Sequence, residues 1–179
     1  ERHYINSANF AVRRDVFESV GGFPEDFETS EDYEYCRRIR AAGLRVYQSR
    51  SLEVAHLDNP RTLGAFFRKM RWHGVGMWSS GGRRLNKPAL MTLANLLLLL
   101  AAVGVLLWPG PLAWPLRLVV AVLAALAVPV MTLAFRLLQV RRAVPVLPSL
   151  FLLELFYLAR AAALPAGLAA RARPRSVGG

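Results

Sequence analysis

The stretch that decides the fold is Ala89–Trp108, which reads ALMTLANLLLLLAAVGVLLW and carries no charge over its 20 residues. An apolar run of about 20 residues is long enough to cross the hydrocarbon core of a bilayer as an α-helix. A second uncharged run, Leu118–Phe135, lies between two arginines. Two such runs, so close together, predict transmembrane helices at about 89–108 and 118–135 rather than buried helices of a soluble core.

The distribution of charge predicts how these helices are oriented. Residues 1–88 hold 15 Lys and Arg with 11 Asp and Glu, whereas residues 89–179 hold 8 and 1. Basic residues flank the outer ends of the two runs, and the link Pro109–Pro115 has no charge. Because cytoplasmic loops are enriched in Lys and Arg, we expect the soluble part to be cytoplasmic. The same clustering predicts membrane lipids, and no nucleic acid, as the partner of the basic residues.

A third apolar stretch, about Val144–Leu164, is interrupted by Glu154 and Arg160. Charged side chains are costly inside the hydrocarbon, so an amphipathic helix in the interface is favoured over a third span. The predicted organisation is therefore a soluble domain in residues 1–82 and two transmembrane helices in residues 83–142. Residues 143–179 are then an interfacial or third membrane helix with a basic tail.

The first 82 residues show the pattern of an α/β domain. Apolar and polar residues alternate over Tyr4–Val12, which predicts a strand. Short strands are also expected over 44–48 and 52–56, and helical spacing predicts helices over 15–20, 31–42 and 63–77. Strands alternating with helices are typical of an α/β fold.

Several polar residues of this domain are candidates for a site. Glu31 and Asp32 begin a helix, where acids either do chemistry or simply stabilise the first turn. His56 ends a predicted strand and is either a ligand or a structural residue. Asn9 lies on the first predicted strand, where a simple edge position is the alternative.

The helix expected over 63–77 carries a cationic side. Arg68 and Arg71 are three residues apart, and Trp72 is four residues after Arg68. Arginines beside a tryptophan are suited to bind a phosphate and a sugar or base ring. The alternative is a cationic helix that lies against anionic lipid headgroups.

Taken together, these motifs resemble the second half of a family 2 glycosyltransferase with the GT-A fold, over residues 4–78. The resemblance rests on the segments Asn9-Phe10-Ala11-Val12-Arg13-Arg14, Val20-Gly21-Gly22-Phe23, Glu31-Asp32-Tyr33-Glu34, Arg38 to Gly43 and Val54-Ala55-His56. The apolar runs behind them are similar to those of bacterial membrane-anchored members. The resemblance implies a partial GT-A (Rossmann-like) α/β domain followed by transmembrane α-helices, in a bacterial inner membrane.

The resemblance also implies roles for single residues. Asp32 would be the general base of an inverting sugar transfer, and Glu31 would orient or tune the site. Gly22 and Phe23 would shape the acceptor wall, and His56 would be a metal ligand. The candidate substrate-binding residues are Asn9, Gly22, Phe23, Arg68, Arg71 and Trp72.

Arg68-Lys69-Met70-Arg71-Trp72 is similar to the Gln-x-x-Arg-Trp motif of processive cellulose and hyaluronan synthases, with Arg68 in place of the Gln. This departure argues against processive polymer synthesis, which stays an alternative. The other alternative is a membrane-anchored scaffold or binding module without catalysis.

The family's nucleotide-binding half, with its Asp-x-Asp metal motif, is expected before Glu1. That half would bind most of a divalent Mg or Mn ion, and residues 1–179 alone are expected to be inactive. The implied partners are a nucleotide-sugar donor and a lipid-linked or glycan acceptor.

Overall fold

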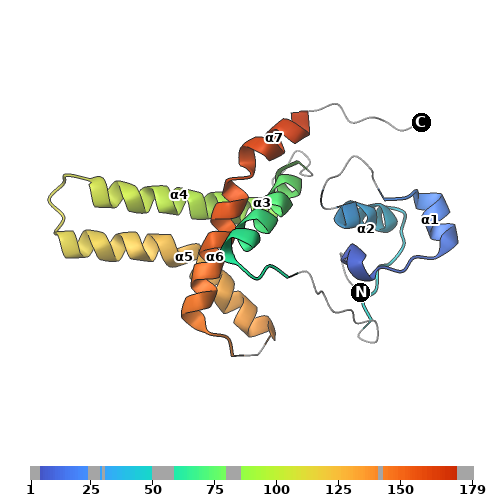
Figure 1. Ribbon diagram of the computed structural model, residues 1–179, viewed down its shortest axis with the longest axis horizontal. Coiled ribbons are helices and arrows are strands. Elements are labelled where there is room, and N and C mark those ends of the chain that lie inside the picture. The colour runs from blue at the N-terminus through green and yellow to red at the C-terminus, as the bar shows by residue number, and fades with distance from the viewer. Residues whose placement is uncertain are drawn as a thin grey trace.

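The computed structural model describes residues 5–23, 29, 31–49, 59–79, 86–140 and 143–172 (Figure 1). Helices follow one another along the chain. In order they are the short 3-10 turn η1 (Ser7–Asn9), α1 (Arg14–Val20), α2 (Glu31–Ala41), α3 (Leu63–Ser79), α4 (Lys87–Leu107), α5 (Trp114–Val140), α6 (Val146–Ala161) and α7 (Leu164–Ala172).

The predicted α/β, GT-A-like fold class is wrong, because the described residues form helices and no strand. The expected first strand contains η1, which is capped by the Asn6 side chain. Phe10 beyond it has an extended backbone, with φ −119° and ψ 123°. Alternation of side chains predicts such an extended backbone but supplies no second strand to pair with it, and an unpaired strand is not a sheet.

The other two expected strands have different outcomes. Residues 44–48 follow the end of α2 without regular secondary structure. Their one buried side chain, Val46, packs into the apolar core that α2 forms and is not part of a β-strand. The expected strand at 52–56, with His56, lies outside the described residues.

A small apolar core joins α2 to the preceding segment. Tyr35, Cys36, Ile39 and Val46 are buried together. Partly buried side chains cover them, from Ile5, Phe10, Val12, Val16 and Val20. The spacing of three and four residues along α2 turns one stripe of the helix inward, and this core fixes the position of the first turn of α2.

Three segments are long and apolar enough to cross a membrane, namely Lys87–Leu107, Trp114–Gln139 and Val146–Ala172. α4 and α5 form an antiparallel hairpin that extends away from α3 (Figure 1). Arg117 closes the link of the hairpin, since its guanidinium donates to the carbonyls of Trp108, Gly110 and Leu112. These properties indicate a membrane protein. The third segment is divided into α6 and α7 by a turn at residues 162–163.

α6 crosses the α4–α5 hairpin near the start of α4, at a steep angle in the view of Figure 1. Two polar contacts hold the crossing. Asn95 Nδ2 donates to Glu154 Oε1 at 3.0 Å, and the hydroxyls of Thr132 and Tyr157 lie 2.7 Å apart. Polar pairs of this kind join helices inside apolar bundles.

α3 rests on the turn between α6 and α7. Trp78 Nε1 donates to the Arg160 carbonyl at 2.8 Å. Glycines allow the close approach: a Cβ at Gly74 would lie 2.7 Å from the Ala163 Cβ, and one at Gly167 would lie 2.3 Å from the Trp78 Cβ. The helix that precedes the membrane segments is therefore fixed directly on them.

Candidate functional site

The chain just before α2 meets α3 near its C-terminal end, through Thr29 and Gly76. Thr29 is 2% exposed. A Cβ at Gly76 would lie 1.6 Å from the Thr29 Oγ1 and 2.9 Å from both the Thr29 Cβ and the Thr29 carbonyl oxygen. Since no side chain fits there, the absence of a Cβ at Gly76 lets the chain before α2 touch the α3 backbone.

Two carboxylates follow this contact within three residues. Asp32 is 6% exposed, and its Oδ2 accepts from the backbone N–H of Ser7 at 3.1 Å. Its Oδ1 accepts from the Tyr33 N–H at 2.8 Å. Glu31 lies in the more open position and accepts from the Ser7 hydroxyl at 3.2 Å. Ser7 therefore bridges both acids, because the η1 turn presents its N–H and O–H on one side.

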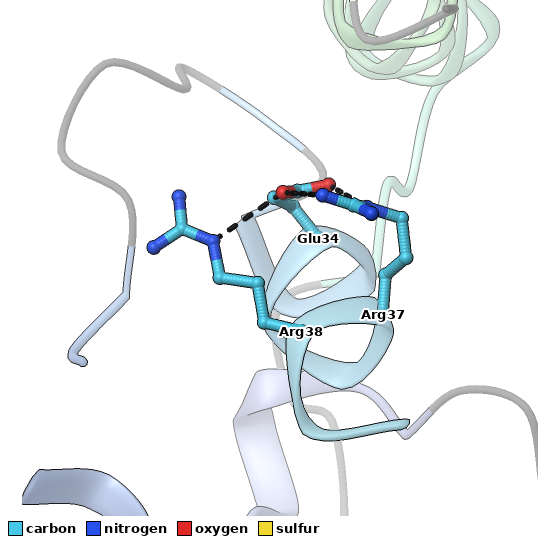
Figure 2. Close-up of polar contacts among 3 residues, drawn as sticks. All are labelled: Glu34, Arg37 and Arg38. Carbon is cyan, nitrogen blue, oxygen red and sulfur yellow. Dashed lines mark hydrogen bonds and ion pairs between the residues drawn. The ribbon is translucent and has the colours of Figure 1, made fainter. Parts of the chain in front are cut away.

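A third acid of the same turn has a different role. The Glu34 carboxylate pairs with Arg37 at 2.7 Å and with Arg38 at 3.3 Å (Figure 2). These hydrogen bonds and charges, Arg37 first, lower the pKa of Glu34. Glu34 thus stabilises α2 as an ion-pair network, which leaves Glu31 and Asp32 as the acids of the candidate site.

A cationic groove of about 330 Å³ lies on α3 and the residues before it. It is lined by Pro60, Ala65, Arg68, Lys69 and Trp72. Trp72 is 49% exposed, so its ring is available to a ligand. Residues at spacings of three and four share a helix face, so Lys69 and Trp72 lie on the face that carries Gly76. At 1.5 Å per residue, Lys69 is about 10 Å along the axis from the contact with Thr29.

Thr29 thus meets α3 about two turns beyond Lys69, and none of the residues that line the groove belongs to α2. Such an arrangement of fixed cations and one held carboxylate can bind a phosphorylated substrate and accept a proton from it or from a second substrate.

Comparison with known proteins identifies the class. The model of glycosyl transferase family group 2 matches residues 5–162, which covers most of the chain. The chain belongs to glycosyl transferase family group 2. No curated protein and no solved structure matches it. Membership confirms the resemblance drawn from residues 4–78, and the match continues through the membrane helices of this glycosyltransferase.

The structure brings together some of the predicted residues of the glycosyltransferase. Glu31 and Asp32 meet through Ser7, and Arg68 and Trp72 both line the groove. Arg71 is exposed on the same helix and is not among the lining residues of the groove.

The predicted acceptor wall lies apart from the groove lining. The Phe23 ring packs on the Tyr35 ring at 4.5 Å and on the Phe10 ring at 5.8 Å. A Cβ at Gly22 would lie 3.2 Å from the Phe17 ring. Gly22 and Phe23 thus belong to the aromatic cluster between α1 and α2. Asn9 ends η1, two residues after Ser7, and is half-buried.

The predicted metal site finds no support in the described residues. His56 lies outside them. Within them, no group of three or more His, Cys, Asp or Glu side chains is placed to hold a metal ion. Glu31 and Asp32 supply two carboxylates at the site.

One residue of the site was missed by the sequence reasoning. His73 is half-buried on α3, three residues before Gly76, and its ring contacts the Trp72 ring at 4.9 Å. Burial lowers the pKa of His73, as do the charges of Arg160 and Lys69, while Asp32 and Glu31 act in the opposite sense. The available signal was the spacing of Lys69, His73 and Gly76 along one helix face.

Proposed function

We propose that this glycosyltransferase moves a sugar from a nucleotide-sugar donor to a hydroxyl of a lipid-linked or glycan acceptor, with inversion at the anomeric carbon. The observation that carries the proposal is the Asp32 carboxylate, held by two backbone N–H groups at the contact between α2 and α3. A general base must be fixed close to the hydroxyl that it deprotonates. Family membership supplies the reaction class.

The proposed reaction is a single displacement. An Asp32 carboxylate oxygen takes the proton of the acceptor O–H while that oxygen forms its bond to the anomeric carbon. The bond from the anomeric carbon to the diphosphate breaks, and the nucleoside diphosphate leaves with the bonding electron pair. One base is sufficient because the nucleophile attacks from the face opposite to the leaving group.

The α3 groove supports the leaving-group side of this proposal. Arg68 and Lys69 line it, and fixed cations stabilise negative charge that develops on a departing diphosphate. Trp72 offers an exposed ring for a sugar or base to stack on. Glu31, bound through Ser7, would help to hold the η1 turn and so the position of Asp32.

The packing of α3 supports a substrate at the membrane surface. α3 contacts both α6 and α7, and Trp78 is bonded to Arg160. A groove on such a helix lies close to the segments that can cross the bilayer. A membrane-anchored acceptor could therefore present its hydroxyl to Asp32 without leaving the bilayer, and the basic flanks of these segments favour the cytoplasmic face.

The test is the variant Asp32→Asn in the natural protein that carries this sequence, reconstituted into vesicles. Loss of a general base lowers turnover by about 10²- to 10⁴-fold, whereas nucleotide-sugar binding should remain close to that of the wild type. Glu34→Gln is the matched control, because Glu34 is an acid of the same helical turn that is paired with Arg37 and Arg38. Near-normal turnover of Asp32→Asn would show that the base is another group.

A further inference from the structure

Arg160 lies near the end of α6, at the junction where α6 and α7 meet α3 (Figure 1). Its backbone is in direct contact with α3. The Trp78 indole N–H donates to the Arg160 carbonyl at 2.8 Å, and a Cβ at Gly74 would lie 3.1 Å from the Arg160 Cα. The guanidinium therefore starts from a fixed point, at the place where α3 rests on the apolar segments.

Among the described residues, the charge of this guanidinium has no acid to pair with. Its Nε is buried and has no hydrogen-bond partner there. Its Nη1 donates to the Met77 sulfur at 3.6 Å, which is a weak acceptor, and its Cζ lies 4.1 Å from the centre of the Phe156 ring. Glu154, the other charged residue of α6, is bonded to Asn95 instead. A sulfur and an aromatic ring thus surround a full positive charge.

Such a charge calls for an anion from outside the described part of the chain. Enclosing a cation without a counter-charge is costly, and buried charges in proteins are paired or hold a ligand. Arg160 as a whole is partly exposed, so part of its side chain stays open to an incoming group. A guanidinium has planar donors whose spacing fits the oxygens of a phosphate.

The surroundings of Arg160 favour a phosphate that is carried by a lipid. The segment Val146–Ala172, to which Arg160 belongs, is long and apolar enough to cross a membrane. It also exposes Leu158 on α6 and Leu168 on α7. Leucines of this kind can contact acyl chains, whereas a free phosphate ion gains nothing from them. Basic groups between membrane helices are suited to lipid head groups.

We propose that Arg160 binds the phosphate group of a membrane lipid at the junction of α3, α6 and α7. The phosphate supplies the missing negative charge, and the acyl chains face the exposed leucines. Because Met77 and Trp78 of α3 contact the same arginine, the bound lipid also holds α3 on the apolar segments. The site goes beyond the proposed sugar transfer and does not require Asp32 to be the base.

The test is thermal unfolding of the natural protein that carries this sequence, purified in a maltoside detergent, with phosphatidic acid as the probe. Diacylglycerol with the same acyl chains is the control lipid, because it lacks only the phosphate. Phosphatidic acid should raise the unfolding temperature of the wild type in a saturable way, and diacylglycerol should not. In Arg160→Met the midpoint concentration of this titration should rise by about 10- to 100-fold. Arg160→Lys should lie between the two, since lysine keeps the charge but not the planar donors.

Three results would overturn the proposal. The first is an equal weakening in Arg136→Met, the matched control, which removes an exposed arginine of α5 and should keep the wild-type midpoint. The second is a response of the wild type to diacylglycerol as large as that to phosphatidic acid. The third is an equal response to inorganic phosphate at the same concentration, which would mean that the site takes a free anion and not a lipid.

A purely structural role of Arg160 gives a different pattern. Without lipid, Arg160→Met should unfold at or above the wild-type temperature, because a cation without a counter-charge has been removed. A variant that is less stable without lipid, yet responds to phosphatidic acid as the wild type does, would show that Arg160 only packs the junction. If Arg160→Met does not fold, Arg160→Lys decides, and an unchanged midpoint overturns the proposal. None of these measurements uses sugar transfer, so an active Asp32→Asn variant would leave this site standing.

Discussion

Gly76→Ala is the substitution that most directly tests how the site is assembled. The new Cβ would lie 1.6 Å from the Thr29 Oγ1, and 2.9 Å from the Thr29 Cβ and carbonyl oxygen. Ordinary van der Waals contacts of a Cβ begin near 3.4 Å. Turning the Thr29 hydroxyl away cannot relieve all of this overlap, because the carbonyl oxygen and Cβ remain too close. The chain before α2 must therefore move away from α3 by several tenths of an ångström.

The cost of this change can be bounded from the structure. Overpacking of a closed contact costs about 1–3 kcal/mol, and Thr29 is only 2% exposed, so there is little room for relaxation. Alanine in place of glycine returns about 1 kcal/mol of helix propensity. The net loss of stability is then about 0–2 kcal/mol. Displacement of a catalytic group by about 1 Å costs about 10²-fold in rate, so transfer should suffer more than folding.

The assay compares sugar-transfer rate and thermal unfolding in vesicles for Gly76→Ala and for a control, Gly104→Ala. Gly104 lies in α4, and a Cβ there meets no atom within 4 Å. The control should keep wild-type transfer and stability. Gly76→Ala should lose at least about tenfold in turnover, with a change in unfolding of no more than about 2 kcal/mol.

A second substitution shows whether the loss arises at this contact. Thr29→Ala in the Gly76→Ala background removes the Oγ1 overlap, so the double variant should recover part of the lost turnover, which is a positive coupling between neighbours. The reasoning is refuted if Gly76→Ala transfers sugar at the wild-type rate, or if Gly104→Ala loses as much activity.

Two further predictions concern stability. Asn95→Leu removes the donor to Glu154 Oε1 between α4 and α6, so the free energy of unfolding in detergent should fall by about 0.6–2 kcal/mol. Glu154→Gln can still accept a hydrogen bond from Asn95 and should lose less stability. An Asn95→Leu variant that is more stable than the wild type would contradict a stabilising role of this contact. The Glu34 ion pairs with Arg37 and Arg38 lower the pKa of Glu34 in the folded state. Their contribution, about 0.5 kcal/mol for partly exposed pairs, is present above the unfolded pKa of about 4.3 and is lost as the pH falls through the folded pKa. The difference in unfolding temperature between the wild type and Glu34→Gln should therefore shrink below about pH 4. A difference that persists below that pH would show that the ion pairs of Glu34 are not its cause.

The helices were predicted well where their signals are local. α4 covers all but the last residue of the apolar run 89–108, and α5 extends beyond 118–135 at both ends. At its N-terminal end the helix can include Arg117, because the guanidinium folds back onto the carbonyls of the link. The helices expected over 31–42 and 63–77 appear as α2 and α3 with small changes at their ends.

The strands were predicted from the alternation of side chains, which is a local pattern, whereas a sheet also requires a second segment to pair with. Alternation indicates which side chains of an extended segment turn inward, but sheet formation needs hydrogen bonds from another segment. In the described residues the segment around Phe10 is extended and packs on Tyr35 of α2 through its side chain. A helix, and not a neighbouring strand, buries the apolar side of this segment, and the alternating pattern is compatible with that outcome.

The sequence by itself determined the apolar segments, the family and the acids at the start of α2, because each depends on residues close together in the chain. Only the tertiary structure decided that Thr29 meets Gly76, that Ser7 joins Glu31 to Asp32, and that the charges acting on His73 come from three helices. Thr29 and Gly76 are distant in sequence, and no periodicity relates them. Their contact depends on how α2, α3 and the turn after α6 pack together, which is a property of the whole arrangement and not of any single stretch.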